Sequence, residues 1–280
     1  MDFEGHKGWI LDAHLCSKRK DMLVWIVPED GPVFSYREQW NPSLHVSGLV
    51  SELEVLVEWL NQPEIQLKFG IMSHLFEYKR LELGLVDQTR VLTVEVDAYQ
   101  SLKPLAQHIE ERGKHVRFTL YSVDLQPEQA YLTSKRLTIG SLVIIKNQQL
   151  VPIEQEVVRR SLRCCRFEVE FRKTNGFVDD STEISHVLVE ECTAEGKILE
   201  RTYMIPVDHP TFVMTLGQCL RELDPDVLFT RDGSTLALPA LLEYAKRHEQ
   251  VLHLGRNSSS VRQIGVSRTV HSYGQVLRSE

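Results

Sequence analysis

The chain has 280 residues, of which 42% are hydrophobic, so it is long enough to bury a substantial core. Its formal net charge is −7, which excludes a simple polycation, because sequence-independent affinity for DNA comes largely from lysine and arginine. Any contact with DNA must therefore use a local basic surface.

The hydrophobic runs and the cysteines exclude several further classes of protein. No run reaches the roughly 18 consecutive apolar residues of a membrane span, and residues 1–6 lack a basic segment that leads into an apolar one. The five cysteines have neither zinc-site spacing nor the density of a disulfide framework. We expect a cytoplasmic protein with reduced thiols and no membrane partner.

The first part of the chain has strand patterns followed by a helix pattern. Apolar stretches at residues 8–11 and 22–27, separated by charged and turn residues, predict the strands of a meander. Leucines at helical spacing predict an amphipathic helix over residues 48–61. Ser51 and Glu54 are spaced as a capping box at its start.

A compact α+β module is expected next. β-branched residues predict a strand at 91–96, and a helix is expected to begin after Ser101 and to end at Gly113. A further strand is expected at 116–123.

Two domains are expected, joined by a polar segment. Residues 146–152 are polar and end in proline, which is typical of a joint between domains. We place the boundary near residue 155, which gives an N-terminal domain of residues 1–155 and a second domain of residues 156–280.

The second domain shows a strict alternation followed by helix and strand patterns. Apolar and charged residues alternate with a period of two at residues 165–171, so one face of this strand is core and the other is charged. Strands followed by helix, strand and helix predict a mixed sheet with helices packed on it. The expected elements are strands at 165–171, 186–192, 198–205 and 226–230, and helices at 212–223 and from Pro239.

Glu168 and Glu170 are the candidate metal ligands in this strand. Residues at i and i+2 project from the same face of a strand, and phosphodiester cleavage by two divalent cations needs carboxylates that converge. The same alternation is found in any half-exposed strand, so both interpretations stay open.

A basic cluster overlaps this strand. It is either a local surface for nucleic acid or a solvated strand edge and loop. Six basic residues fall within fifteen positions: Arg159, Arg160, Arg163, Arg166, Arg172 and Lys173.

Several segments resemble family B DNA polymerases. Residues 223–242, LDPDVLFTRDGSTLALPALL, resemble the second exonuclease motif of this family, which reads approximately DPDVIITYNGDNFDFPYL. Residues 166–170, RFEVE, resemble the first motif, FDIE. The similarity covers about residues 115–280, and further segments that carry it are residues 121–125, 129–132, 254–256 and 270–274.

The resemblance implies an α/β (α+β) protein with two parts. An N-terminal mixed α+β domain would be followed by a ribonuclease H-like 3′–5′ exonuclease domain with a mixed sheet. The polymerase signatures DxxSLYP, KxxxNSxYG and YxDTD do not occur in the sequence. We therefore expect the chain to be part of a longer DNA-directed DNA polymerase, with palm, fingers and thumb on the same chain or on a separate subunit, and the third exonuclease motif beyond Glu280.

The sequence departs from the family at the positions that would hold metal. Glu168 stands where the family has an aspartate, while Glu170 matches the family's glutamate. Asp232 falls at the second motif's asparagine, and Ala237 falls at its metal-binding aspartate. The resemblance thus implies an inactivated exonuclease without a tightly bound cofactor. Mg²⁺ or Mn²⁺ is expected only if Asp232 and a further carboxylate complete a site with the two glutamates.

The leading hypothesis is a non-catalytic DNA-binding scaffold in DNA replication or repair, with single-stranded or primer–template DNA as the partner. The first alternative is an active Mg²⁺-dependent 3′–5′ exonuclease. The second is a protein-interaction module without a nucleic-acid role. The candidate nucleic-acid-binding residues are Arg163, Arg166, Arg172, Lys173 and Arg231.

Overall fold

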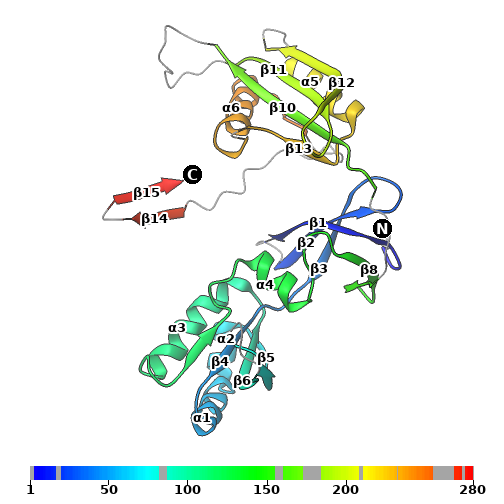
Figure 1. Ribbon diagram of the computed structural model, residues 1–280. Helices are drawn as coiled ribbons and strands as arrows, with labels where there is room; N and C mark the ends of the chain where they lie inside the picture. The colour runs from blue at the N-terminus through cyan, green and yellow to red at the C-terminus, as the bar shows by residue number, and fades with distance from the viewer. Residues whose placement is uncertain are drawn as a thin grey trace. The chain divides into compact units, whose positions relative to one another are not determined.

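The chain forms two compact units, Met1–Arg159 and Arg160–Glu280, in a computed structural model (Figure 1). The structure describes residues 3–16, 20–81, 87–154, 160–172, 184–207, 211–231, 233–254, 268–272 and 275–279. The boundary expected near residue 155 falls among residues 155–159, which lie outside the described residues. None of the helices in the described ranges is long and apolar enough to span a membrane.

The predicted α+β fold class is confirmed. The first unit contains a five-stranded antiparallel sheet with the order β3-β2-β1-β8-β9. The predicted meander forms its first three strands, which pair as consecutive neighbours. The strands are β1 (Lys7–Cys16), β2 (Asp21–Pro28), β3 (Phe34–Gln39), β8 (Leu142–Lys146) and β9 (Gln149–Pro152).

Helix α4 (Pro127–Ser134) packs against this sheet through Tyr131, which is completely buried. The Tyr131 hydroxyl donates a hydrogen bond of 2.6 Å to Glu38 of β3, and Lys135 also contacts this carboxylate. The backbone N–H of Leu150 in β9 donates to Glu38 at 3.3 Å. One buried glutamate therefore connects the two edge strands of the sheet with the end of the helix.

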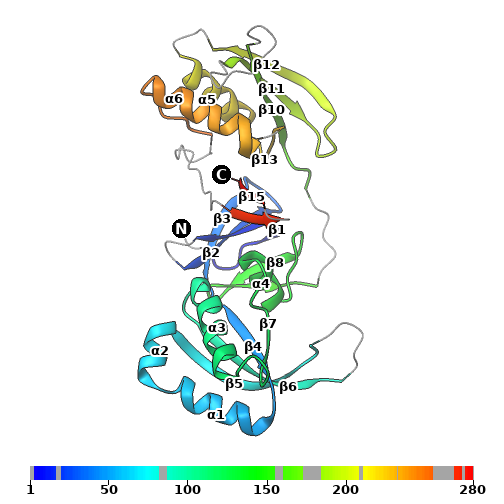
Figure 2. The ribbon, with the colours of Figure 1, turned by 90° about the vertical axis from the view of Figure 1, so that its left-hand side faces the viewer.

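A second sheet in the same unit has the order β5-β6-β4-β7 and carries helices on one face (Figure 2). Residues of β4 and β6, such as Leu44 and Val94, pack against leucines of the helices, and the buried residues of β4 alternate with less buried ones. The elements are β4 (Ser43–Ser47), α1 (Val50–Leu60), α2 (Pro63–Phe69), β5 (Ile71–Lys79), β6 (Thr89–Val96), a 3₁₀ turn (Tyr99–Ser101), α3 (Leu102–Arg112) and β7 (Thr119–Tyr121).

Three expectations for the first unit were wrong in detail. The capping box does not form, because the helix begins at Val50 and Ser51 lies inside it rather than before it. The strand expected at 116–123 is limited to Thr119–Tyr121. The segment 146–152 is the hairpin of β8 and β9 rather than a joint between domains, and Asn147 and Gln148 adopt the left-handed conformation of its turn.

The second unit contains the predicted mixed sheet, and the order of its strands is β12-β11-β10-β13. β10 pairs antiparallel with β11 and parallel with β13. Two helices cover one face of this sheet, because their apolar stripes join the cluster formed by Phe167 and Val189 (Figure 2). The elements are β10 (Cys164–Phe171), β11 (Ile184–Cys192), β12 (Ile198–Pro206), α5 (Phe212–Leu223), β13 (Val227–Phe229), a π-helical turn (Gly233–Ala237), α6 (Leu238–Arg247), β14 (Arg268–Ser272) and β15 (Gln275–Ser279).

Candidate nuclease-like face and aromatic cavity

The predicted metal ligands lie on the charged face of β10. Phe167 and Val169 pack into the hydrophobic cluster beneath α5 and α6. Glu168 and Glu170 occupy the alternate positions and therefore point to the opposite face of the strand. Glu170 is exposed and Glu168 is half-buried. The structure thus brings these two glutamates to one face, as the sequence predicted.

Arg166 shares this face and forms ion pairs with two carboxylates. Its Nη2 atom lies 2.9 Å from Oε1 of Glu168, and its Nε atom lies 3.5 Å from Oε2 of Glu190. Glu190 lies directly opposite Arg166 on β11. The hydrogen bond to Glu168, followed by the charge of that carboxylate, raises the pKa of the Arg166 guanidinium. The sequence alone does not point to Glu190, because cross-strand pairing joins residues that are distant in the chain.

Ala237 belongs to the hydrophobic core. It ends the π-helical turn before α6, is 3% exposed and lies in the cluster that also contains Phe167. Its methyl group cannot ligate a cation, and its surroundings are apolar. Asp232, the proposed substitute ligand, lies outside the described residues.

The described residues do not fit the pair of divalent cations that the active-exonuclease alternative requires. Such a pair needs several carboxylates around it. Within the described ranges, no group of three His, Cys, Asp or Glu side chains is placed to hold a metal ion. Glu168 is already paired with Arg166, and the third expected position is the buried Ala237.

The structure gives the predicted nucleic-acid-binding residues different surroundings. Arg163 and Arg166 are ion-paired with acidic residues of the same unit. Arg172 and Arg231 are exposed. Lys173 lies outside the described residues. A role in nucleic-acid binding stays a prediction for all five.

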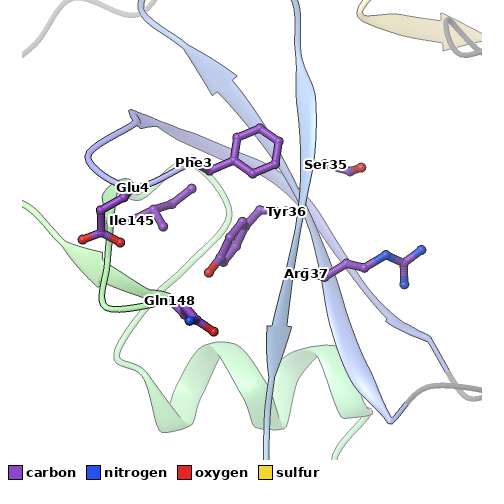
Figure 3. A pocket seen from close by; sticks show the side chains of 7 residues that line it. All are labelled: Phe3, Glu4, Ser35, Tyr36, Arg37, Ile145 and Gln148. Atoms are coloured by element: carbon purple, nitrogen blue, oxygen red, sulfur yellow. The ribbon is translucent and has the colours of Figure 1, made fainter. Parts of the chain in front are cut away.

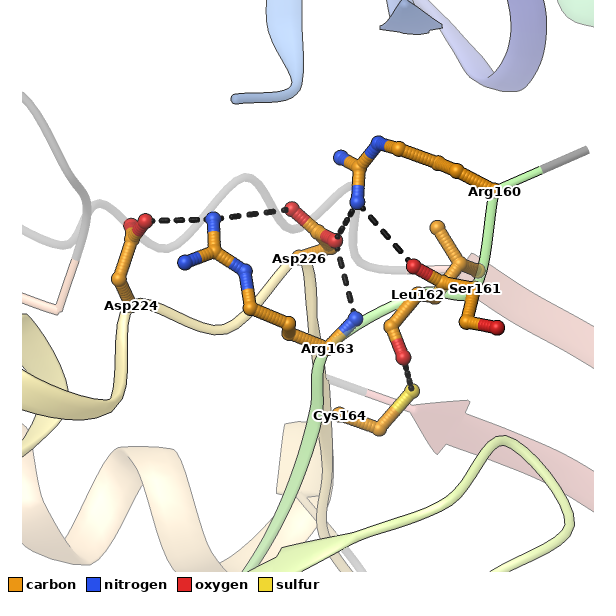
Figure 4. A network of polar contacts seen from close by, with 7 residues as sticks. All are labelled: Arg160, Ser161, Leu162, Arg163, Cys164, Asp224 and Asp226. Carbon is orange, nitrogen blue, oxygen red and sulfur yellow. Dashed lines mark hydrogen bonds and ion pairs between the residues drawn. The ribbon is translucent and has the colours of Figure 1, made fainter. Parts of the chain in front are cut away.

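The Asp224–Pro225–Asp226 segment of the second motif has a structural role (Figure 4). The side chain of Asp226 is completely buried and accepts hydrogen bonds from Nη1 of Arg160 at 2.8 Å and from the backbone N–H of Arg163 at 3.0 Å. Nη2 of Arg163 lies 2.6 Å from Oδ2 of Asp224. These contacts fix the chain before β10 to the start of β13, its parallel neighbour. Two arginines of the basic cluster are therefore held in the framework of the unit.

A cavity of about 530 Å³ lies in the first unit, beside the edge strand β3. The segment before β1 forms one wall: Phe3 stacks on Phe34 with ring centroids 4.9 Å apart, and Glu4 accepts a hydrogen bond from the backbone N–H of Asn147 at 3.0 Å. The lining residues are Phe3, Glu4, Ser35, Tyr36, Arg37, Ile145 and Gln148.

Tyr36 provides the aromatic surface of this cavity on the strand side. Figure 3 shows its ring on the side of Phe3 and Ile145, whereas Ser35 and Arg37 point to the other side of β3. The rings of Tyr36 and Phe3 meet edge to face at 6.1 Å. Burial, followed by the charges of nearby Glu38 and Glu4, raises the pKa of Tyr36. Its hydroxyl therefore stays protonated at neutral pH and remains a hydrogen-bond donor.

Comparisons with known proteins agree with the predicted resemblance at the level of the fold. No protein-family model and no curated protein sequence matches the chain. Among solved structures, the chain is similar to the family B DNA polymerase from the hyperthermophilic archaeon Pyrobaculum calidifontis, with a TM-score of 0.67 and 16% sequence identity. The match covers 97% of this chain and 35% of that polymerase, so the chain spans about a third of the polymerase's length. The chain thus has the fold of part of a family B DNA polymerase.

Proposed function

We propose that the chain is a non-catalytic DNA-binding scaffold of the family B polymerase type, acting in replication or repair beside polymerase domains. The observation that carries the proposal is the polymerase-like fold over nearly the whole chain, combined with the apolar burial of Ala237. In this proposal the second unit is a ribonuclease H-like exonuclease domain that has lost its metal-dependent chemistry. The setting would be the cytoplasm, as expected from the sequence.

The aromatic cavity supports a role in binding single-stranded DNA. Unpaired bases stack on aromatic rings with little dependence on sequence, and the partly exposed Phe3 offers such a ring beside polar groups of Glu4 and Gln148. A volume of about 530 Å³ lies within the range of small-molecule sites. Because the net charge of the chain is −7, we expect weak binding, with Kd of about 1–100 µM that rises with salt.

DNA binding can be tested by fluorescence anisotropy with labelled single-stranded and primer–template oligonucleotides. The measurements cover about 25–200 mM NaCl, the range in which phosphate contacts weaken. Phe3→Ala should weaken binding of the single strand by about 5–100-fold, the loss expected from one stacked base. Tyr78→Ala is the matched control, since Tyr78 is an exposed aromatic residue of β5 in the same unit. Absence of binding at the lowest salt would refute the scaffold role and favour a protein-interaction module.

A nuclease assay tests the second half of the proposal. The wild-type chain should not shorten a 3′-labelled single strand in the presence of Mg²⁺ or Mn²⁺. Ala237→Asp should not create activity, because the new carboxylate would be buried in an apolar cluster and would lower stability by several kcal/mol. Metal-dependent degradation by the wild type that is abolished by Glu168→Gln would show that the exonuclease alternative is correct.

A further inference from the structure

The charged face of β10 carries an excess of negative charge beside one positive charge. Arg166, Glu168 and Glu170 occupy every second position of β10, and Glu190 lies opposite Arg166 on β11. We call these four residues the acidic face. Glu190 is nearly buried, with 10% of its side chain exposed, and Glu168 has 26% exposed. Carboxylates with so little contact to water need a nearby positive charge.

Arg166 is placed to supply that charge to both strands at once. Its guanidinium reaches Glu168 on its own strand at 2.9 Å and Glu190 on the neighbouring strand at 3.5 Å. A guanidinium has donors in a fixed fork and remains charged at all relevant pH values. It therefore acts on two carboxylates as a bridging cation would.

A divalent cation would compete with this arrangement. Metal binding to Oε1 of Glu168 would displace the Arg166 guanidinium from that oxygen, and a metal ion beside Arg166 would bring two cations close together near Glu190. Repulsion between the guanidinium and the metal would add to the cost, because charges separated by a few ångströms interact strongly where water is partly excluded. Arg166 thus supplies positive charge to both carboxylates, through a close pair with Glu168 and through an ion pair with Glu190 in which Nε and Oε2 form no hydrogen bond.

We infer that Arg166 is a built-in counter-ion that takes the place of a divalent cation on the acidic face. The sheet keeps its acidic residues and remains stable without metal because the positive charge is part of the chain. The inference rests on the proposed loss of nuclease chemistry. It identifies Arg166 as the residue whose charge stabilises the acidic face when no metal ion is bound.

The inference can be tested by thermal unfolding of the full chain with and without about 5 mM MnCl₂. The ionic strength is matched between the two conditions, so that general screening by salt does not differ. The melting temperature of the wild type should not respond to Mn²⁺. Arg166→Met should lower it by about 4–10 °C, since a partly buried ion-pair network loses its cation. Mn²⁺ should then restore part of the loss, because the freed carboxylates accept a metal ion.

Three further variants make the test specific. Arg166→Lys keeps one charge without the fork, so it should melt between the wild type and Arg166→Met and should not respond to Mn²⁺. The triple variant Arg166→Met/Glu168→Gln/Glu190→Gln should regain stability without metal and lose the response to Mn²⁺. Arg201→Met is the control, because Arg201 pairs with Glu191 at 3.8 Å in the same sheet but is largely exposed; its melting temperature should change by less than about 2 °C.

Binding of Mn²⁺ measured by electron paramagnetic resonance gives an independent readout. The wild type should leave Mn²⁺ free at millimolar concentrations, and Arg166→Met should bind it. Wild-type binding that is lost in Glu168→Gln, or an Arg166→Met protein without any metal response, would overturn the inference. Failure to bind DNA would refute only the scaffold role, since the metal measurements contain no nucleic acid.

Discussion

The Asp226 carboxylate is completely buried and lies 2.8 Å from Nη1 of Arg160, sixty-six positions earlier in the chain. The same oxygen accepts a hydrogen bond from the backbone N–H of Arg163. A carboxylate removed from water is stable only with such partners. The second acidic residue of the polymerase-like DPD segment therefore stabilises the second unit.

Asp226→Ala should destabilise the second unit by about 3–5 kcal/mol, because it leaves the Arg160 guanidinium without its buried counter-charge. Urea denaturation followed by circular dichroism measures this change. Asp224→Asn is the matched control: Asp224 ends α5 in the left-handed conformation, which asparagine tolerates, and its ion pair with Arg163 is partly exposed. A loss above about 2 kcal/mol in the control, or below 1 kcal/mol in Asp226→Ala, would contradict this assignment.

Glu38 should be equally important for the first unit. Glu38→Ala removes the buried acceptor shared by Tyr131, Lys135 and the backbone N–H of Leu150, and should cost about 3–5 kcal/mol. Tyr131→Phe removes one hydrogen bond and should cost about 1–2 kcal/mol. Chemical denaturation of the two variants beside the wild type checks the order of these losses. Equal losses would mean that the hydroxyl, rather than the charge of Glu38, determines the stability of this junction.

His45 should make the first unit sensitive to acid. Burial, followed by the charge of Lys79, lowers its pKa to about 4, while the nearby Glu77 opposes this shift. Its Nδ1 atom lies 2.9 Å from Oγ1 of Thr93, and Nζ of Lys79 lies 3.3 Å from its Nε2 atom. The neutral ring satisfies both contacts by donating from Nδ1 and accepting at Nε2. An unfolded histidine titrates near 6.5, so the unfolded state binds the proton more tightly than the folded state.

The free energy of unfolding should therefore fall as the pH decreases from about 6.5 to about 4. Relative to His45→Gln, the wild type should lose about 1–2 kcal/mol over this range, after allowance for partial exposure of the ring. Urea denaturation between pH 4 and pH 8 (about the range that brackets both pKa values) measures the difference. Parallel curves for the two proteins would refute the role of His45, because titrating carboxylates contribute equally to both.

Four of the five cysteines should be unreactive in the folded chain. Burial raises the pKa of Cys165 to about 12 and of Cys219 to about 11, and it also raises the pKa of Cys164 and Cys192. The thiolate is the reactive species. Ellman's reagent at pH 8 should therefore modify only Cys16, which is partly exposed, and should modify all five after unfolding. Cys16→Ser should abolish the fast reaction; a second fast thiol would contradict the burial of the other four.

The local patterns of the sequence were sufficient to predict many helices and strands of the fold. The alternation around Phe167 required a strand with one charged face, and the apolar spacing in residues 212–223 required a helix, because both patterns depend only on backbone period. The sequence also predicts that position 237 cannot ligate a metal ion, since an alanine has no oxygen to offer. The polar segment 146–152 predicts a joint between domains, but it is a hairpin, because β8 pairs with β9 across its turn.

The partners of the charged groups were decided only by the tertiary structure. The sequence placed Arg163 and Arg166 in a basic cluster, but folding brings Asp224 to the first and Glu190 to the second. The aromatic cavity likewise combines Phe3, Tyr36 and Ile145 from three separate segments. Backbone period fixes which face a side chain occupies, whereas the neighbour across that face depends on strand pairing and loop closure between distant residues. Charge neutralisation and cavity shape therefore arise at the level of tertiary contacts.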